Sequence, residues 1–165
     1  MPSTSQTSDQ PSLDALPEAV FRGRRVLVTG GTGFVGGRLV ERLAHAGAQV
    51  RVLVRNFSRA TRIARFPVEM LAGDLIDSGA VAKAVRDVDT VFHSAVGSGG
   101  DEDMERRVTV GGTRSLLEAS LSSGVKRFVN VSTGMVYQPL QEGVVDENSP
   151  PSQGTDQYTT SKLAA

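Results

Sequence analysis

Thr29-Gly30-Gly31-Thr32-Gly33-Phe34-Val35-Gly36 follows directly on the apolar run Val26-Leu27-Val28. Apolar residues at helical spacing come next, so the order predicts a strand, a glycine-rich turn and a helix. Glycine suits this turn because the backbone bends sharply out of the strand and must approach a diphosphate more closely than a Cβ would allow. N–H groups at the start of the helix would then bind the anion.

The loop and the first residues of its helix are therefore the predicted diphosphate site. The alternative is a glycine turn with a purely structural role, and the visible strand and helix on either side favour the nucleotide interpretation. The predicted contacts to the cofactor in this stretch are Gly30, Thr32, Gly33, Phe34, Val35 and Gly36.

Composition limits the class of protein. The 165 residues correspond to about one domain, and 18 basic and 18 acidic residues cancel, so no overall field favours nucleic acid or an anionic membrane. The absence of cysteine excludes disulfides, thiolate metal sites and cysteine nucleophiles. No apolar run approaches the ~20 residues that span a bilayer, and the N-terminus lacks a signal-peptide layout. These features predict a cytoplasmic protein without nucleic-acid, membrane or metal partners.

Strand and helix patterns alternate along most of the chain. Residues 1–22 are rich in Ser, Thr, Gln and Pro and are predicted to be a disordered leader, which leaves 23–165 as the folded domain. Alternation of this kind predicts an α/β fold with a doubly wound parallel sheet. Strands are expected at about 26–28, 49–54, 68–74, 90–93 and 126–133, and helices at about 34–46, 77–86 and 103–123.

Arg55 follows the second predicted strand, at a point where dinucleotide folds that bind NAD place an Asp or Glu against the ribose 2′-hydroxyl. Arg59 and Arg62 follow at helical spacing, so their guanidinium groups could gather beside Arg55. Arginine is suited to bidentate recognition of phosphate, whereas a carboxylate would repel a 2′-phosphate. The sequence thus predicts NADP, with NAD as the alternative. For Arg59, Arg62 and Arg65, a solvated helix face is an equally good interpretation.

Two further strand ends carry candidate cofactor contacts. Asp74 could accept a hydrogen bond from an adenine amino group, and Leu75 could contact the ring, although Gly-Asp is also common in simple turns. Ser94 and Ala95 are small enough to let the cofactor lie against the backbone. His93, beside them, is interpreted as a packing or hydrogen-bonding residue in preference to a base or a metal ligand.

Tyr158 and Lys162 are four residues apart and share a face if this segment is helical. A lysine ammonium beside a phenol favours the phenolate and lowers a reference pKa of about 10. Such a tyrosine can exchange a proton with a carbonyl oxygen during hydride transfer. Thr133, at the end of the fifth predicted strand, could bind the same oxygen through its hydroxyl.

With these motifs in this order, the chain resembles the extended branch of the short-chain dehydrogenase/reductase superfamily, and within it the NAD-dependent epimerase/dehydratase family and its dihydroflavonol-reductase-like members. The resemblance implies that Thr133, Tyr158 and Lys162 form the catalytic set, that Tyr158 and Lys162 also contact the cofactor, and that Asp74 and Leu75 contact adenine. The motifs that carry it are Thr29-Gly30-x-x-Gly33-x-x-Gly36, Gly73-Asp74-Leu75, Val91-Phe92-His93-Ser94-Ala95, Gly112-Thr113, Ser132-Thr133-x-x-Val136-Tyr137 and Tyr158-x-x-Ser161-Lys162.

The chain departs from the family pattern in two residues and in length. Thr109 stands where the family commonly has Asn, and Thr159 replaces a frequent Gly. Extended members continue well beyond the lysine, whereas this sequence ends at Ala165, so the domain is expected to be C-terminally incomplete. We therefore expect the isolated 165 residues to be weakly active or inactive.

Two functional hypotheses follow from the sequence. The first is an NADP(H)-dependent oxidoreductase acting on a carbonyl or secondary alcohol, with a nucleotide-sugar epimerase or dehydratase that retains NAD as its variant. The second is a nucleotide-binding module without turnover. The substrate is a small molecule in the first hypothesis, and a homodimer remains open in both.

Overall fold

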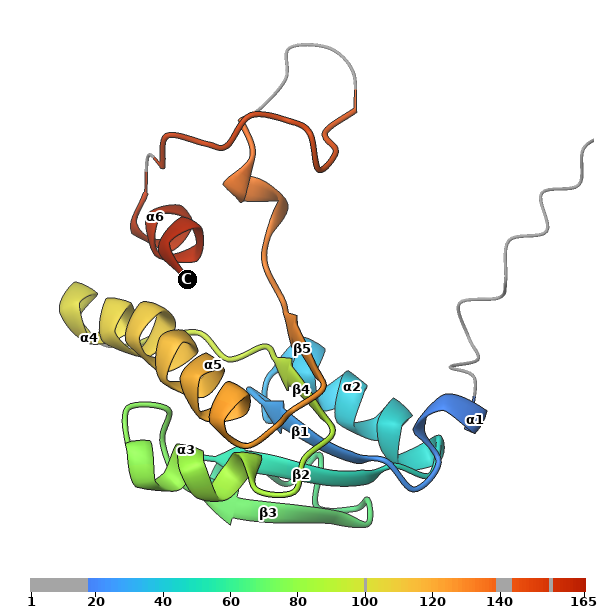
Figure 1. Cartoon of the computed structure of the whole chain (residues 1–165). Helices are drawn as coiled ribbons and strands as arrows, with labels where there is room; N and C mark the ends of the chain where they lie inside the picture. Colours follow the sequence, from blue (N-terminus) through green and yellow to red (C-terminus); the bar gives the residue numbers. More distant parts are fainter. Residues whose placement is uncertain (1–17, 100, 139–143, 155) are drawn as a thin grey trace, which may run out of the picture.

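The computed structural model of the chain describes residues 18–99, 101–138, 144–154 and 156–165. Figure 1 shows a sheet covered by helices, with the C-terminal helix beyond one end of it. The strands are β1 (Arg25–Thr29), β2 (Gln49–Val54), β3 (Val68–Ala72), β4 (Thr90–His93) and β5 (Arg127–Asn130). The α-helices are α1 (Glu18–Phe21), α2 (Phe34–His45), α3 (Ser78–Val85), α4 (Glu102–Arg106), α5 (Gly112–Ser122) and α6 (Gln157–Ala164). Shorter helical segments are η1 (Phe57–Arg59), η2 (Arg107–Gly111) and η3 (Gly134–Val136).

All strand pairs in the sheet are parallel, and the strand order is β3-β2-β1-β4-β5. The chain moves outward from β1 to β3, then crosses back to place β4 on the other side of β1. The strand order thus reverses between β1 and β4, and ligands of open α/β sheets bind at the carboxyl ends of the strands beside such a switch point. The predicted doubly wound parallel sheet is confirmed.

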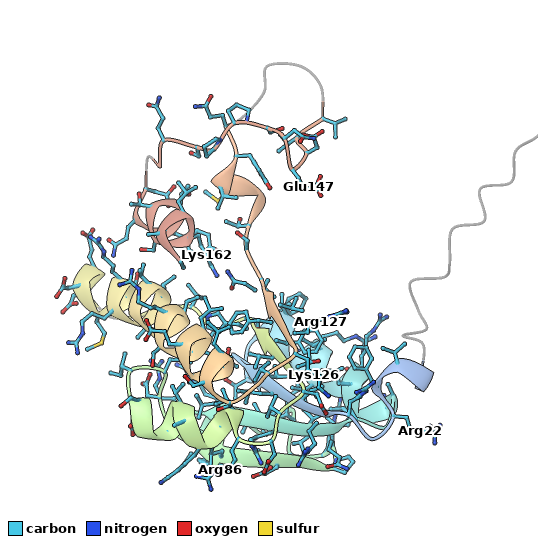
Figure 2. All side chains as sticks on the ribbon, in the orientation of Figure 1. Arg22, Arg86, Lys126, Arg127, Glu147 and Lys162 are labelled. Carbon is cyan, nitrogen blue, oxygen red and sulfur yellow. The ribbon has the colours of Figure 1, made fainter. Side chains whose placement is uncertain are left out.

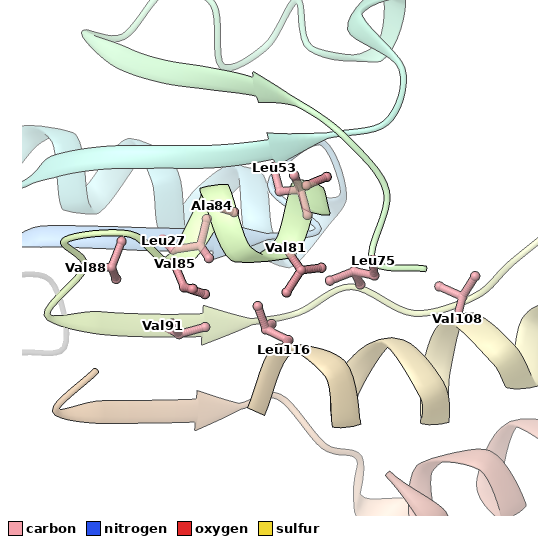
Figure 3. Close-up of a cluster of buried hydrophobic side chains, with 11 residues drawn as sticks. Leu27, Leu53, Leu75, Val81, Ala84, Val85, Val88, Val91, Val108 and Leu116 are labelled. Carbon is pink, nitrogen blue, oxygen red and sulfur yellow. The ribbon is translucent and has the colours of Figure 1, made fainter. Parts of the chain in front are cut away.

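Alternation along β1 builds a core on each face of the sheet. Val26 and Val28 belong to a buried cluster shared with α2, whereas Leu27 belongs to a second cluster shared with α3 and α5. Figure 3 shows this second cluster, which includes Leu116 of α5 and Val91 of β4. Successive side chains of a strand point to opposite faces, so a strand that is apolar throughout needs helices on both sides.

The helix ends explain why the first two long helices match the predicted boundaries. Asp77 accepts hydrogen bonds from Gly79 N at 2.9 Å and Ala80 N at 3.2 Å, which caps α3. Gly47, with φ of +75°, ends the turn after α2.

The predicted fifth strand over 126–133 is too long, because only Arg127–Asn130 pair with β4. β4 itself has four residues, and His93 is the last partner it offers. Beyond it, Val131 N makes one more hydrogen bond, to His93 O at 2.9 Å, before the chain leaves the sheet. The neighbouring strand's length therefore sets the length of β5.

The predicted helix over 103–123 is divided by the π-helical segment η2. Within it, the Thr113 hydroxyl donates to the carbonyl oxygen of Thr109. Gly112 packs against Leu75 in the loop after β3, since a Cβ on Gly112 would lie 2.8 Å from Leu75 Cβ. Within α5, Leu116 is fully buried, whereas Leu121 is 79% exposed.

Two other expectations need correction. Arg59 and Arg62 are not on a regular helix, because η1 is a short 3-10 turn capped by the Asn56 side chain. The predicted leader over 1–22 lies outside the described residues up to residue 17, but Glu18–Phe21 form α1. The Phe21 ring lies 6.1 Å from the Phe92 ring, and this aromatic contact holds α1 against the sheet.

Candidate functional site

A cavity lies at the carboxyl ends of the first four strands. It brings together segments that follow β1, β2, β3 and β4, which are distant in sequence and adjacent in the sheet. Its lining residues are Thr29, Gly30, Thr32, Gly33, Leu53, Arg55, Arg59, Gly73, Asp74, Leu75, Ser94, Ala95, Val96, Ser98 and Val108. The position is the one that the strand-order reversal predicts for a ligand.

Two glycines allow the loop after β1 to pack against the segment after β4. Gly30 has φ of +70°, and a Cβ there would lie 2.6 Å from Ala95 N. A Cβ on Gly36 would lie 2.3 Å from Gly30 O and 2.7 Å from Ser94 Oγ. Both contacts are too short for any side chain. The loop keeps its shape because nothing larger than hydrogen fits at either position.

The start of α2 offers free backbone donors beside this loop. Gly33 is the N-cap residue and makes no side-chain capping bond, and the first intrahelical bond runs from Gly37 N to Gly33 O at 2.9 Å. Helix geometry leaves the N–H groups of the first turn without intrahelical acceptors. Phe34 is 85% exposed and Val35 is 54% exposed. Neither of them lines the cavity, and Gly36 does not line it either. Contacts from these three residues to an anion would come from their N–H groups.

Arg55 and Arg59 line the cavity, whereas Arg62 and Arg65 do not. Arg55 Nη1 lies 3.9 Å from Asp74 Oδ2. That separation exceeds hydrogen-bond length, so the Arg55 guanidinium does not donate a hydrogen bond to Asp74. Arg65 instead lies 3.8 Å from a Glu41 carboxylate oxygen. The structure therefore brings together two of the three arginines, Arg55, Arg59 and Arg62, that were expected to gather here.

The other predicted cofactor residues also reach the cavity. Asp74 and Leu75 line it from the loop after β3, and Ser94 and Ala95 line it from the loop after β4. Ser94 Oγ donates to Thr29 O at 2.8 Å, which ties the ends of β1 and β4 together.

His93 is 1% exposed and both of its ring nitrogens have partners. Thr29 Oγ1 lies 2.6 Å from Nδ1, and Thr113 Oγ1 lies 2.9 Å from Nε2. Burial lowers the pKa of His93 to about 4, and the positive charge of Lys162 acts in the same direction. The interpretation of His93 as a hydrogen-bonding residue is confirmed.

The lowered pKa of His93 predicts a pH-dependent stability. Between an ordinary pKa of 6.5 and the folded-state value of about 4, the unfolded chain binds more protons than the folded one. The stabilising effect is complete above the upper value and is lost as the pH falls through the lower one, by about 3 kcal/mol in total. Urea denaturation should show that the free energy of unfolding falls more steeply between about pH 7 and pH 4.5 for the unchanged protein than for His93→Asn. His45→Gln is the control, and equal slopes for the protein and His93→Asn would refute the prediction.

Tyr158 and Lys162 both lie on α6, as predicted. Asp156 caps this helix by accepting hydrogen bonds from Thr159 N at 2.9 Å and Thr159 Oγ1 at 2.7 Å. These bonds hold the pKa of Asp156 below its usual value. The threonine that replaces the family's frequent glycine thus strengthens the cap of the helix that carries Tyr158.

Lys162 points from α6 toward the segment after β5 (Figure 2), and Nζ donates to Val131 O at 3.0 Å. Only 9% of Lys162 is exposed, and burial lowers the pKa of its ammonium group. Tyr158 is 42% exposed. Thr133 caps η3, accepting from Met135 N at 3.3 Å, and α6 packs against η3. The fold therefore brings the segments of all three predicted catalytic residues to the same end of the sheet.

Several residues at the site were not predicted from the sequence. Thr109 Oγ1 accepts from Gly97 N at 3.0 Å and fixes the loop after β4, so the threonine at the family's asparagine position has a structural contact. Leu53, Val96, Ser98 and Val108 line the cavity. Most of them sit at or after a strand end, a signal that could have found them. Across the described ranges, no cluster of His, Asp and Glu could hold a metal ion, and no helix could cross a bilayer.

The model of the NAD-dependent epimerase/dehydratase family matches residues 26–165. The chain belongs to this family.

Relatives of this epimerase/dehydratase chain have different reactions in their names. A 3β-hydroxysteroid dehydrogenase/Δ5→4-isomerase of Mycobacterium tuberculosis is 39% identical over 154 residues, which cover 86% of this chain and 40% of that protein. The structure of a short-chain dehydrogenase/reductase superfamily protein from Agrobacterium tumefaciens with bound NAD is 31% identical, with a TM-score of 0.74, over 86% of this chain and 42% of the other. The Thermus thermophilus UDP-glucose 4-epimerase complex with NAD is 32% identical, with a TM-score of 0.75, over 85% and 48%. The family member described here thus spans less than half the length of these relatives.

Proposed function

We propose that this protein is an NADP(H)-dependent oxidoreductase that transfers hydride between the nicotinamide and a carbonyl or secondary alcohol. The observation that carries the proposal is the placement of Arg55 and Arg59 in the same cavity as the glycine loop. β2 ends without a carboxylate, so no acidic side chain of that strand repels a 2′-phosphate. Relatives with NAD in their structures support a dinucleotide at this site, and the arginines support the phosphorylated form.

The residues of the cavity fit a dinucleotide on structural grounds. Gly30 and Gly36 leave no room for side chains between the loop and Ala95, and the first turn of α2 presents backbone donors without a capping side chain. The diphosphate would bind at this turn, the adenosine would lie toward Asp74 and Leu75, and the 2′-phosphate would meet Arg55. A bound nicotinamide supplies the hydride.

The chain's own residues would move the proton. In this proposal, Tyr158 gives a proton to the carbonyl oxygen during reduction and takes it back during oxidation. The Lys162 ammonium stabilises the phenolate and binds the cofactor ribose, and the Thr133 hydroxyl binds the substrate oxygen. Capping of α6 by Asp156 supports the placement of Tyr158 and Lys162.

An epimerase or dehydratase that retains NAD is the second candidate. It is favoured by the 32% identity to the Thermus thermophilus UDP-glucose 4-epimerase complex with NAD. Small-molecule substrates are expected in both cases, a nucleotide sugar in the second. The two candidates differ in whether the cofactor is exchanged with each turnover and in the nucleotide that is preferred.

Replacing Arg55 with aspartate tests the cofactor assignment. We expect the ratio of NADPH to NADH affinity to fall about 30-fold, because a charge-assisted hydrogen bond is lost and a repulsive charge is added. Calorimetric titration of both nucleotides measures the ratio. Arg62→Asp is the matched control, since it makes the same charge change outside the cavity and should alter the ratio less than about threefold. An unchanged ratio in Arg55→Asp would remove the NADP assignment.

A further inference from the structure

Three buried side chains, of Thr29, His93 and Thr113, form one hydrogen-bonded chain that ends on the backbone carbonyl of Thr109 and runs from the cavity to the long helix. Thr29 and His93 are each 1% exposed, and Thr109 and Thr113 are each 2% exposed. They come from the end of β1, the end of β4, and both sides of the junction between η2 and α5. Thr29 also lines the cavity. The proposed catalytic set does not include any of these residues.

The direction of each hydrogen bond follows from the partners. The Thr113 hydroxyl donates its hydrogen to the carbonyl oxygen of Thr109, so it can only accept a hydrogen bond from His93. His93 Nε2 must therefore carry the ring proton. In the neutral ring, Nδ1 is then an acceptor, and the Thr29 hydroxyl donates to it across 2.6 Å. This arrangement leaves one consistent tautomer for the whole chain.

The backbone of the same histidine reaches the other half of the site. His93 O accepts from Val131 N at 2.9 Å, and Val131 O accepts from Lys162 Nζ at 3.0 Å. Two consecutive hydrogen bonds thus connect the His93 main chain to the buried lysine of α6. His93 is the residue where the contacts of the phosphate loop and of the lysine meet.

We propose that His93 is a positioning residue of the cofactor site: with its proton on Nε2, it accepts from the Thr29 hydroxyl and so fixes the strand end from which the phosphate loop departs. Its main chain holds the Val131 carbonyl against Lys162. The histidine touches neither nucleotide nor substrate and acts through Thr29 and Lys162. This inference rests on the proposed nucleotide-dependent function.

Two substitutions separate the two ends of the imidazole. In His93→Asn, the amide oxygen occupies about the place of Nδ1 and can still accept from Thr29, but the link to Thr113 is lost. In His93→Gln, the amide nitrogen reaches about the place of Nε2 and can still donate to Thr113, but the link to Thr29 is lost. If His93 merely filled the core, both substitutions would weaken NADPH binding to a similar degree.

The experiment combines titration with NADPH and nitrogen NMR of the imidazoles. The protein has two histidines, so His45→Gln assigns the signals and serves as the control for binding. We expect His93 to show a protonated Nε2 and an unprotonated Nδ1. His93→Gln and Thr29→Val should each raise the Kd for NADPH about tenfold. The double variant should bind NADPH no more weakly than either single variant. His93→Asn should lose clearly less affinity for NADPH than His93→Gln.

Provided that the unchanged protein binds NADPH, either of two results would overturn the proposal. One is a protonated Nδ1 on His93, and the other is a loss of NADPH affinity in His93→Asn as large as that in His93→Gln. Either result would leave the proposed function intact. If the unchanged protein binds neither NADPH nor NADH, the proposed function fails and the inference falls with it. Thermal unfolding of each variant verifies that the measured protein is folded.

Discussion

Replacing Tyr158 with phenylalanine is expected to lower the rate of carbonyl reduction by about two to four orders of magnitude. Phenylalanine keeps the ring on α6 and removes only the hydroxyl that would donate the proton. The effect should fall mainly on kcat, because the missing interaction is one made as the oxygen gains its proton. The measurement is NADPH oxidation with a panel of simple ketones, followed on the full gene product because the relatives are more than twice as long as this chain.

Tyr137→Phe is the matched control for this experiment. The chain contains two tyrosines, and Tyr137 lies at the end of η3, in an isolated bridge with Pro151. Its hydroxyl has no role in the proposed chemistry, so its removal should leave the rate within about threefold. Rates of Tyr158→Phe equal to those of the unchanged protein would remove Tyr158 from the mechanism.

Replacing Gly36 with alanine is expected to destabilise the fold by about 3 kcal/mol and to abolish tight NADPH binding. The new methyl group would lie 2.3 Å from Gly30 O and 2.7 Å from Ser94 Oγ. Gly30 O belongs to the backbone of the phosphate loop, so the loop itself has to move away from α2. The gain of about 1 kcal/mol in helix propensity is too small to offset this clash.

Gly111→Ala provides the control with the opposite sign. A Cβ at Gly111 has no neighbour within 4 Å, and its φ of −64° is helical. Alanine should therefore raise the free energy of unfolding by about 1 kcal/mol, measured by urea denaturation beside Gly36→Ala. Stabilisation by Gly36→Ala would show that the loop does not pack as the structure describes.

The sequence predicts the fold well because its signals are local and agree with one another. β2 and β4 have the predicted boundaries, and α3 begins at the Asp77 cap. Each of these segments combines an apolar pattern with a turn residue or a cap at its end. The parallel order follows because a helix joins most pairs of successive strands.

The errors have tertiary causes. β5 is shorter than its apolar pattern because β4 offers it only four partners. The helix after β4 is divided near the contact of Gly112 with Leu75, a residue distant in sequence. Arg62 does not join Arg55 in the cavity, because Asn56 caps a 3-10 turn where helical spacing was assumed. Such contacts involve residues that no local pattern joins.

Residues that line the cavity were predicted from the sequence, but the hydrogen bonds that join the segments of the site were not. Gly30, Arg55, Asp74 and Ser94 were placed at strand ends and do line one cavity. The hydrogen bonds of His93 to two threonines were not predicted, since Thr29 and Thr113 become its neighbours only in the folded sheet. A buried polar residue needs partners, and the sequence does not show which ones it has.

The preference for NADP is tested most directly by calorimetry of the protein with two fragments of the cofactor, adenosine 2′,5′-bisphosphate and 5′-AMP. They differ only in the 2′-phosphate, so their affinities isolate the contribution of the end of the cavity lined by Arg55 and Arg59. We expect the bisphosphate to bind about 10- to 100-fold more tightly than 5′-AMP, with an advantage that shrinks as salt is added. Equal affinities, or tighter binding of 5′-AMP, would contradict the preference for NADP.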